Sequence, residues 1–134
     1  MNRSKPLARR GGSDRTRRGL RLQEGLTEEA FELIAGRFRV LAEPMRLRLL
    51  HALGDAEMSV SDLVAATNAG QANVSKHLGI LLDSGLVARR KAGLNVFYRV
   101  ADPSVFDMCE AVCSSVGRRL TAHHAAIRGL GART

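Results

Sequence analysis

The sequence predicts a mainly α-helical domain that carries one small β-hairpin. Apolar residues recur at spacings of three and four through most of residues 27–120, which is the period of an amphipathic helix. Residues 86–100 differ, because they contain two short β-type runs around a glycine. The 134 residues include no Trp, one Tyr and four Phe, so we expect a single domain with an aliphatic core.

Positive charge is concentrated at the start of the chain. The formal net charge is +8, yet residues 1–22 hold eight Lys and Arg against one acid, and the rest of the chain is close to neutral. Because this segment also has Gly and Ser but no apolar periodicity, we predict a basic disordered arm over residues 1–24. The arm would add salt-dependent attraction to phosphate, or would only be a solubilising extension.

Composition argues against several other classes of protein. The sequence has no run of 18 apolar residues, and its basic start is not followed by the apolar segment of a secretory signal. The two cysteines are four positions apart and cannot form a secreted disulfide framework. No phosphate-binding loop, catalytic carboxylate pair or activated nucleophile is recognisable. We therefore expect a cytoplasmic protein that has no membrane partner and is not an enzyme.

Two helices are predicted in the first half of the chain. Thr27 is the expected N-cap of a helix over residues 27–41, whose apolar stripe contains Phe31, Ile34, Phe38 and Leu41. Glu43-Pro44 interrupts this helix, and Pro44 suits the first turn of a second helix over residues 44–53 that ends at Gly54.

A helix-turn-helix is predicted next. Ser61 is the expected N-cap of a short helix that ends at Asn68-Ala69-Gly70, and a further helix runs from Gln71 to about Asp83. The second helix of such a pair enters the major groove with its N-terminal half. The polar residues of that half, which we expect to reach bases or phosphates of double-stranded DNA, are Gln71, Asn73, Ser75, Lys76 and His77.

A cationic hairpin follows this helix. Strands at residues 86–88 and 95–100 are predicted around the loop RRKAGL. Arg89, Arg90 and Lys91 would then lie on a flexible tip beside Gly93 and, with Asn95, grip the DNA backbone or minor groove.

The order and spacing of these elements resemble the ArsR/SmtB family of winged helix-turn-helix repressors over roughly residues 30–120. The segments that carry the resemblance are LAEPMRLRLLHAL (41–53), SVSDLV (59–64), NVSKHLGILLDSGLV (73–87) and RRKAGLNVFYRVAD (89–102). The resemblance implies a homodimer that binds an inverted-repeat operator and leaves it when an inducer binds. An apolar stripe on a last helix over residues 102–120 fits such a dimer, so the domain would span residues 25–122 and residues 123–134 would form a tail.

The inducer is not apparent from the resemblance. Where some relatives hold zinc between the last helices, this chain has Asp102 but also Ser104, Ser115 and Arg118, which are unsuitable. It also has no cysteine at residues 60–63, where other relatives bind thiophilic ions.

Cys109 and Cys113 are the remaining sensor candidates. Their i, i+4 spacing suits a bridging thiophilic metal or metalloid ion, or a reactive sulfur signal, better than a direct disulfide. Both could equally be packing residues, and no cofactor is certain. In that case the chain would be a regulator without thiol sensing, or a protein-interaction or architectural winged helix.

Overall fold

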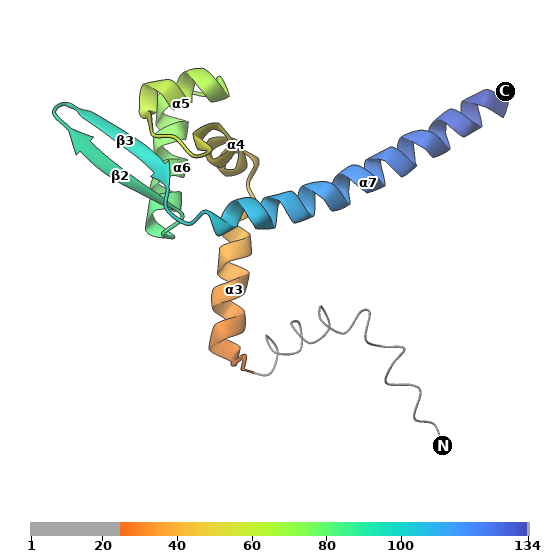
Figure 1. The fold of residues 1–134 in the computed structure, drawn as a ribbon, viewed down its shortest axis with the longest axis horizontal. Coiled ribbons are helices and arrows are strands. Elements are labelled where there is room, and N and C mark those ends of the chain that lie inside the picture. Colours follow the sequence, from red (N-terminus) through yellow and green to blue (C-terminus); the bar gives the residue numbers. More distant parts are fainter. Residues whose placement is uncertain (1–24, 134) are drawn as a thin grey trace. The chain divides into compact units, whose positions relative to one another are not determined.

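The computed structural model describes residues 25–133. It consists of helices and one small β-sheet (Figure 1). The predicted basic arm at residues 1–24 lies outside the described residues. The elements, in chain order, are α3 (Glu28–Leu41), α4 (Pro44–Leu53), β1 (Met58–Ser59), α5 (Val60–Thr67), α6 (Gln71–Asp83), β2 (Val87–Ala92), β3 (Asn95–Val100) and α7 (Ser104–Arg133). The mainly α fold with a β-hairpin is confirmed. The chain divides into two units after Leu41, and each is described separately below.

The first unit contains α3, whose start is the predicted one. The Thr27 hydroxyl accepts a hydrogen bond from the backbone N–H of Ala30 at 3.1 Å, as an N-cap should. The apolar stripe is also present, but its aromatic members Phe31 and Phe38 are 49% and 54% exposed. An apolar stripe that remains exposed in a single chain is available to a partner.

The second unit begins with α4, which Glu43 caps. The Glu43 carboxylate accepts hydrogen bonds from the backbone N–H groups of Met45 (2.7 Å) and Arg46 (3.3 Å), and Pro44 occupies the first turn. The helix ends where predicted, with the Gly54 N–H donating to the Leu50 carbonyl at 3.0 Å. The buried residues on this helix are Met45, Leu49, Leu50 and Leu53.

The helix-turn-helix is formed by α5 and α6, and both pack against α4 and each other. The N-cap of α5 is Ser59, so the prediction of Ser61 is wrong. Ser59 and Asp62 form a reciprocal capping box, in which each side chain accepts from the other residue's backbone N–H at 3.1 and 3.0 Å. Asn68, in the left-handed conformation with φ 55°, ends α5, and α6 begins at Gln71 as predicted.

The wing is an antiparallel hairpin of β2 and β3, to which the two-residue strand β1 adds an unpredicted third member in the order β1-β3-β2. Paired residues run from Val87 opposite Val100 to Ala92 opposite Asn95. Only Gly93 and Leu94 form the turn, so the prediction of a flexible RRKAGL loop is wrong. Gly93 has φ +64°, which suits the first central position of a two-residue hairpin turn.

The last helix, α7, is longer than predicted and continues through the residues expected to form a tail. The Asp102 carboxylate caps its start by accepting from the backbone N–H and the hydroxyl of Ser104 at 3.1 and 2.6 Å. Val105 is buried at 1% exposure, whereas the stripe Val112, Val116 and Leu120 is 50–58% exposed. Among the described residues, no helix is both long and apolar enough to span a bilayer.

Candidate nucleic-acid interface

The first half of α6 presents polar side chains to solvent. All four of Gln71, Asn73, Ser75 and Lys76 are exposed, and Val74 between them is fully buried. Their amide, hydroxyl and ammonium groups can pair with base edges or with phosphate oxygens. Four of the five residues predicted for this surface therefore lie where DNA could reach them.

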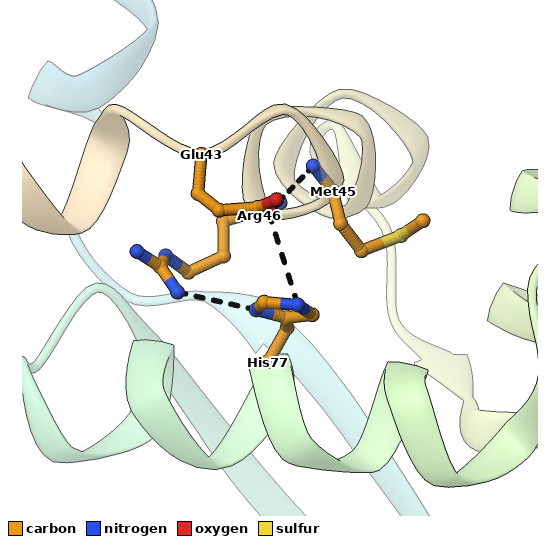
Figure 2. A network of polar contacts seen from close by, with 4 residues as sticks. All are labelled: Glu43, Met45, Arg46 and His77. Carbon is orange, nitrogen blue, oxygen red and sulfur yellow. Dashed lines mark hydrogen bonds and ion pairs between the residues drawn. The ribbon is translucent and has the colours of Figure 1, made fainter.

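His77, the fifth residue predicted for this surface, lies instead in the core. It is 6% exposed, and its ring contacts two residues from the start of α4 (Figure 2). Nδ1 lies 3.1 Å from Arg46 Nη1, and Nε2 lies 3.8 Å from Glu43 Oε2. Because a guanidinium can only donate, Nδ1 accepts this hydrogen bond and the ring proton is on Nε2. His51, on α4, is exposed.

The pKa of Glu43 reflects this position. Partial burial of the carboxylate raises its pKa, but the backbone N–H groups of Arg46 and Met45 and the nearby His77 and Arg46 side chains lower it. The net result is a pKa below the ordinary glutamate value, so Glu43 is ionised at neutral pH. One carboxylate thus caps α4 and faces the histidine of α6.

The sequence contained a signal for the burial of His77. Val74, His77, Leu78 and Leu81 follow the i, i+3, i+4, i+7 spacing of a buried stripe, and the structure buries all four. No local pattern indicated its partners, because Arg46 precedes His77 by 31 residues.

The cations of the wing lie along a paired strand. Arg89, Arg90 and Lys91 all belong to β2 and are exposed. Since successive strand residues point to opposite faces, Arg89 and Lys91 share one face and Arg90 lies on the other. Asn95, opposite Ala92, is also exposed.

Arg90 already has a protein partner. Its Nε and Nη2 donate to Glu57 Oε2 and Oε1 at 3.1 and 2.9 Å, and its guanidinium lies 5.2 Å from the centroid of the Phe97 ring, within the range of a cation–π contact. The hydrogen bonds from Arg90 lower the pKa of Glu57, and the same contact raises the pKa of Arg90. Glu57 could not be recognised as this partner from the sequence, since it precedes Arg90 by 33 residues.

The predicted sensor residues lie on α7. Cys109 is half-buried and Cys113 is exposed, and both are free thiols. The Asp102 carboxylate accepts hydrogen bonds from Ser104 at the start of α7. Within the part of the chain that the structure describes, no three His, Cys, Asp or Glu side chains are grouped so that they could hold a metal ion.

A helix-turn-helix with exposed polar groups on its second helix, followed by a cationic hairpin, defines a winged helix-turn-helix of the DNA-binding class. Residues 43–89 match the family model described as "Bacterial regulatory protein, arsR family". The chain is 30% identical over 107 residues to the uncharacterised regulator Rv0081 of Mycobacterium tuberculosis. The aligned residues make up 79% of this chain and 94% of the relative. The chain belongs to the ArsR/SmtB family of bacterial regulators.

Another relative is more similar over a shorter stretch. The "Transcriptional repressor SmtB homolog" of Synechocystis sp. is 43% identical over 75 residues, which are 56% of this chain and 57% of that protein. For that relative, the match covers little more than half of its length.

Solved structures agree with this assignment. The crystal structure of Rv0081 matches with a TM-score of 0.65 and covers 72% of this chain and 98% of the neighbour. The antimony-specific transcriptional repressor AntR matches with a TM-score of 0.64 at 33% identity, covering 72% and 88%. A homodimeric winged helix-turn-helix domain from Mycobacterium bovis matches with a TM-score of 0.63 at 27% identity, covering 75% and 95%.

Proposed function

We propose that this chain is a transcriptional repressor that binds an inverted-repeat DNA operator as a homodimer and leaves it when an inducer binds. The observation that carries the proposal is the exposed polar half of α6, followed in the chain by a hairpin with exposed cations. Gln71, Asn73, Ser75 and Lys76 would contact base edges and phosphates in the major groove. Arg89, Lys91 and Asn95 would contact the flanking backbone or the minor groove.

Two exposed apolar stripes support dimerisation. On α7, Val112, Val116 and Leu120 recur every four residues and lie on one helix face. On α3, the exposed apolar residues are Phe31, Leu33, Ile34 and Phe38. Burying these stripes against a second copy would remove them from water, and one structural neighbour is described as homodimeric. A two-fold axis would then set two copies of α6 about 34 Å apart, one turn of DNA.

A selection experiment with the full chain tests operator binding. Duplexes that the protein retains from a randomised DNA library are sequenced, and the molar mass of the complex is measured by light scattering. We expect enrichment of an inverted repeat bound by a dimer. We also expect Asn73→Ala and Lys76→Ala to bind the enriched duplex more weakly, by about 5- to 100-fold for lost base and phosphate contacts. Equal binding to the enriched and scrambled duplexes would contradict the proposal and favour a protein-interaction or architectural module.

We further propose that the inducer is a thiophilic metalloid or metal ion, or a reactive sulfur species, bound by Cys109 and Cys113. Support comes from their i, i+4 spacing on α7, from the accessibility of both thiols in the single chain, and from an antimony-specific repressor among the structural neighbours. A dyad near this part of α7 would bring two thiol pairs together, as soft ions prefer.

The inducer proposal is tested by releasing the reduced dimer from the enriched duplex. Trivalent antimony, arsenite, zinc and an organic persulfide are each titrated against the wild type and a Cys109→Ser/Cys113→Ser variant. We expect release by a thiophile that is absent in the variant. If the two proteins respond alike, the cysteines are packing residues.

A further inference from the structure

We infer that His77 is a positioning residue for DNA recognition, which with Arg46 and Glu43 fixes the orientation of the first half of α6. The inference rests on the proposed function, in which α6 is the recognition helix. According to this inference, His77 affects operator affinity although it is buried and does not itself contact DNA.

The first half of α6 has few other anchors. Within the fully described stretch 71–77, the buried side chains are Val74 and His77. The N-cap of α6 is Gly70, which has no side chain to cap the helix. Packing of Val74, and of Leu78 and Leu81 further along α6, against the core is favourable but non-directional, so a directional contact at His77 adds a constraint on the rotation of this half about the helix axis. Exposed residues on both sides of Val74 would move with any such rotation.

The polar contacts of His77 constrain the rotation of this half of α6 about the helix axis. Both ring nitrogens face the start of α4, with Nδ1 3.1 Å from Arg46 Nη1 and Nε2 3.8 Å from Glu43 Oε2 (Figure 2). The same Glu43 oxygen accepts from the backbone N–H groups of Met45 and Arg46 at 2.7 and 3.3 Å, which anchors it to the first turn of α4. Hydrogen bonds weaken steeply with misalignment, so the 3.1 Å bond between Arg46 and His77 holds the imidazole, and with it α6, in one rotational setting. The Glu43 carboxylate, at 3.8 Å, lies beyond hydrogen-bond distance and adds electrostatic attraction.

Two substitutions separate positioning from packing. Leucine fits the apolar stripe of Val74, Leu78 and Leu81 and has a higher helix propensity than asparagine, so His77→Leu should be at least as stable as His77→Asn. Asparagine, however, keeps an acceptor near the site of Nδ1 and can still accept from Arg46. A positioning role therefore predicts that the two variants rank oppositely in stability and in operator affinity. The leucine variant should be the more stable, and the asparagine variant should bind the operator more tightly.

The experiment measures both orders with the full chain. Unfolding by denaturant gives stability, and titration of the enriched duplex and of a scrambled duplex gives specific and non-specific affinity. We expect His77→Leu to lose about tenfold in specific affinity, as for one charged hydrogen bond, with little change on the scrambled duplex. His77→Asn should stay within about threefold of the wild type. Arg46→Met, which keeps the apolar stem of a half-exposed side chain, should reproduce the leucine result independently of the packing around His77.

The double variant and two controls define the outcomes. Arg46→Met/His77→Leu should lose about as much specific affinity as His77→Leu alone, because Arg46→Met then removes a hydrogen bond that is already absent. If affinity instead follows stability through the series, or if Arg46→Met binds like the wild type, the inference is overturned.

The variants Asn73→Ala and Lys76→Ala distinguish failure of this inference from failure of the proposed function. If they weaken binding and His77→Leu does not, only the inference fails. If neither control weakens binding, the proposed role of α6 fails with it.

Discussion

The two elements proposed to contact DNA each have a carboxylate partner, but the side chains that these carboxylates face differ in burial. On α6, Glu43 and Arg46 hold a histidine that is 6% exposed, although the Glu43 side chain itself is 36% exposed. On the wing, Glu57 holds Arg90, and these side chains are 33% and 55% exposed. Water and salt screen an exposed ion pair, whereas a buried polar group that loses its partner cannot form a hydrogen bond with water instead. We therefore expect the first network to affect the orientation of a helix, and the second to affect how much of an arginine's charge is available to DNA.

The largest expected effect comes from removing the apolar support beneath α6. Leu78 is fully buried next to His77, and Leu78→Ala should lower the free energy of unfolding by about 2–5 kcal/mol through lost burial and a cavity. Specific and scrambled duplexes should then be bound more weakly in proportion to the unfolded fraction, measured by denaturant titration and DNA binding. Leu94→Ala, at a fully exposed turn position, is the matched control with no expected change in stability. A stable Leu78→Ala protein would mean that α6 does not depend on this core.

The comparison also shows which parts of the site could be predicted from the sequence. The bounds of α4 and the start of α6 depend on local signals, namely Pro44, Gly54 and the Asn68-Ala69-Gly70 turn. The sequence predicts a loop rather than a strand at residues 89–91, because a run of cations lacks the alternation of apolar residues by which strands are recognised. Its extent is set instead by pairing with Val96–Tyr98 across the hairpin.

The long-range contacts could not have been predicted. Glu57 with Arg90 and Arg46 with His77 are 33 and 31 residues apart, so no helical or strand period relates them. They exist because the helix-turn-helix returns α6 to α4 and because β1 enters the sheet beside β3. His77 differs, since its spacing from Val74 and Leu81 already indicated a buried position.

A smaller effect is expected when the wing cations are compared. Lys91→Gln should reduce the slope of log affinity against log salt by about 0.9, the value for one lost phosphate contact. Arg90→Gln should reduce it less, because Glu57 already balances the charge of Arg90. In a Glu57→Gln background the Arg90 effect should rise toward that of Lys91. Equal slopes for the two single variants would show that Glu57 does not compete with DNA for Arg90.

The smallest effect is expected at Glu43, because glutamine keeps a capping oxygen and loses only the charge. Glu43 has a pKa below its ordinary value of 4.5 in the folded chain. Its charge therefore contributes stability that is complete above pH 4.5 and is lost as the pH falls through the folded pKa. Glu43→Gln should be less stable than the wild type near neutral pH, with a difference that narrows in acid, measured by denaturant unfolding across that range.

Glu110→Gln, an exposed residue of α7, serves as the control for loss of one carboxylate elsewhere. A Glu43→Gln difference that stays constant with pH would assign the role of Glu43 to its shape as a cap rather than to its charge. Since the same carboxylate faces His77, a charge effect predicts that wild-type operator affinity also falls in acid, beyond any fall in the variant. The contacts of His77 would then link the ionisation of one side chain at the start of α4 to the orientation of the helix proposed to read DNA.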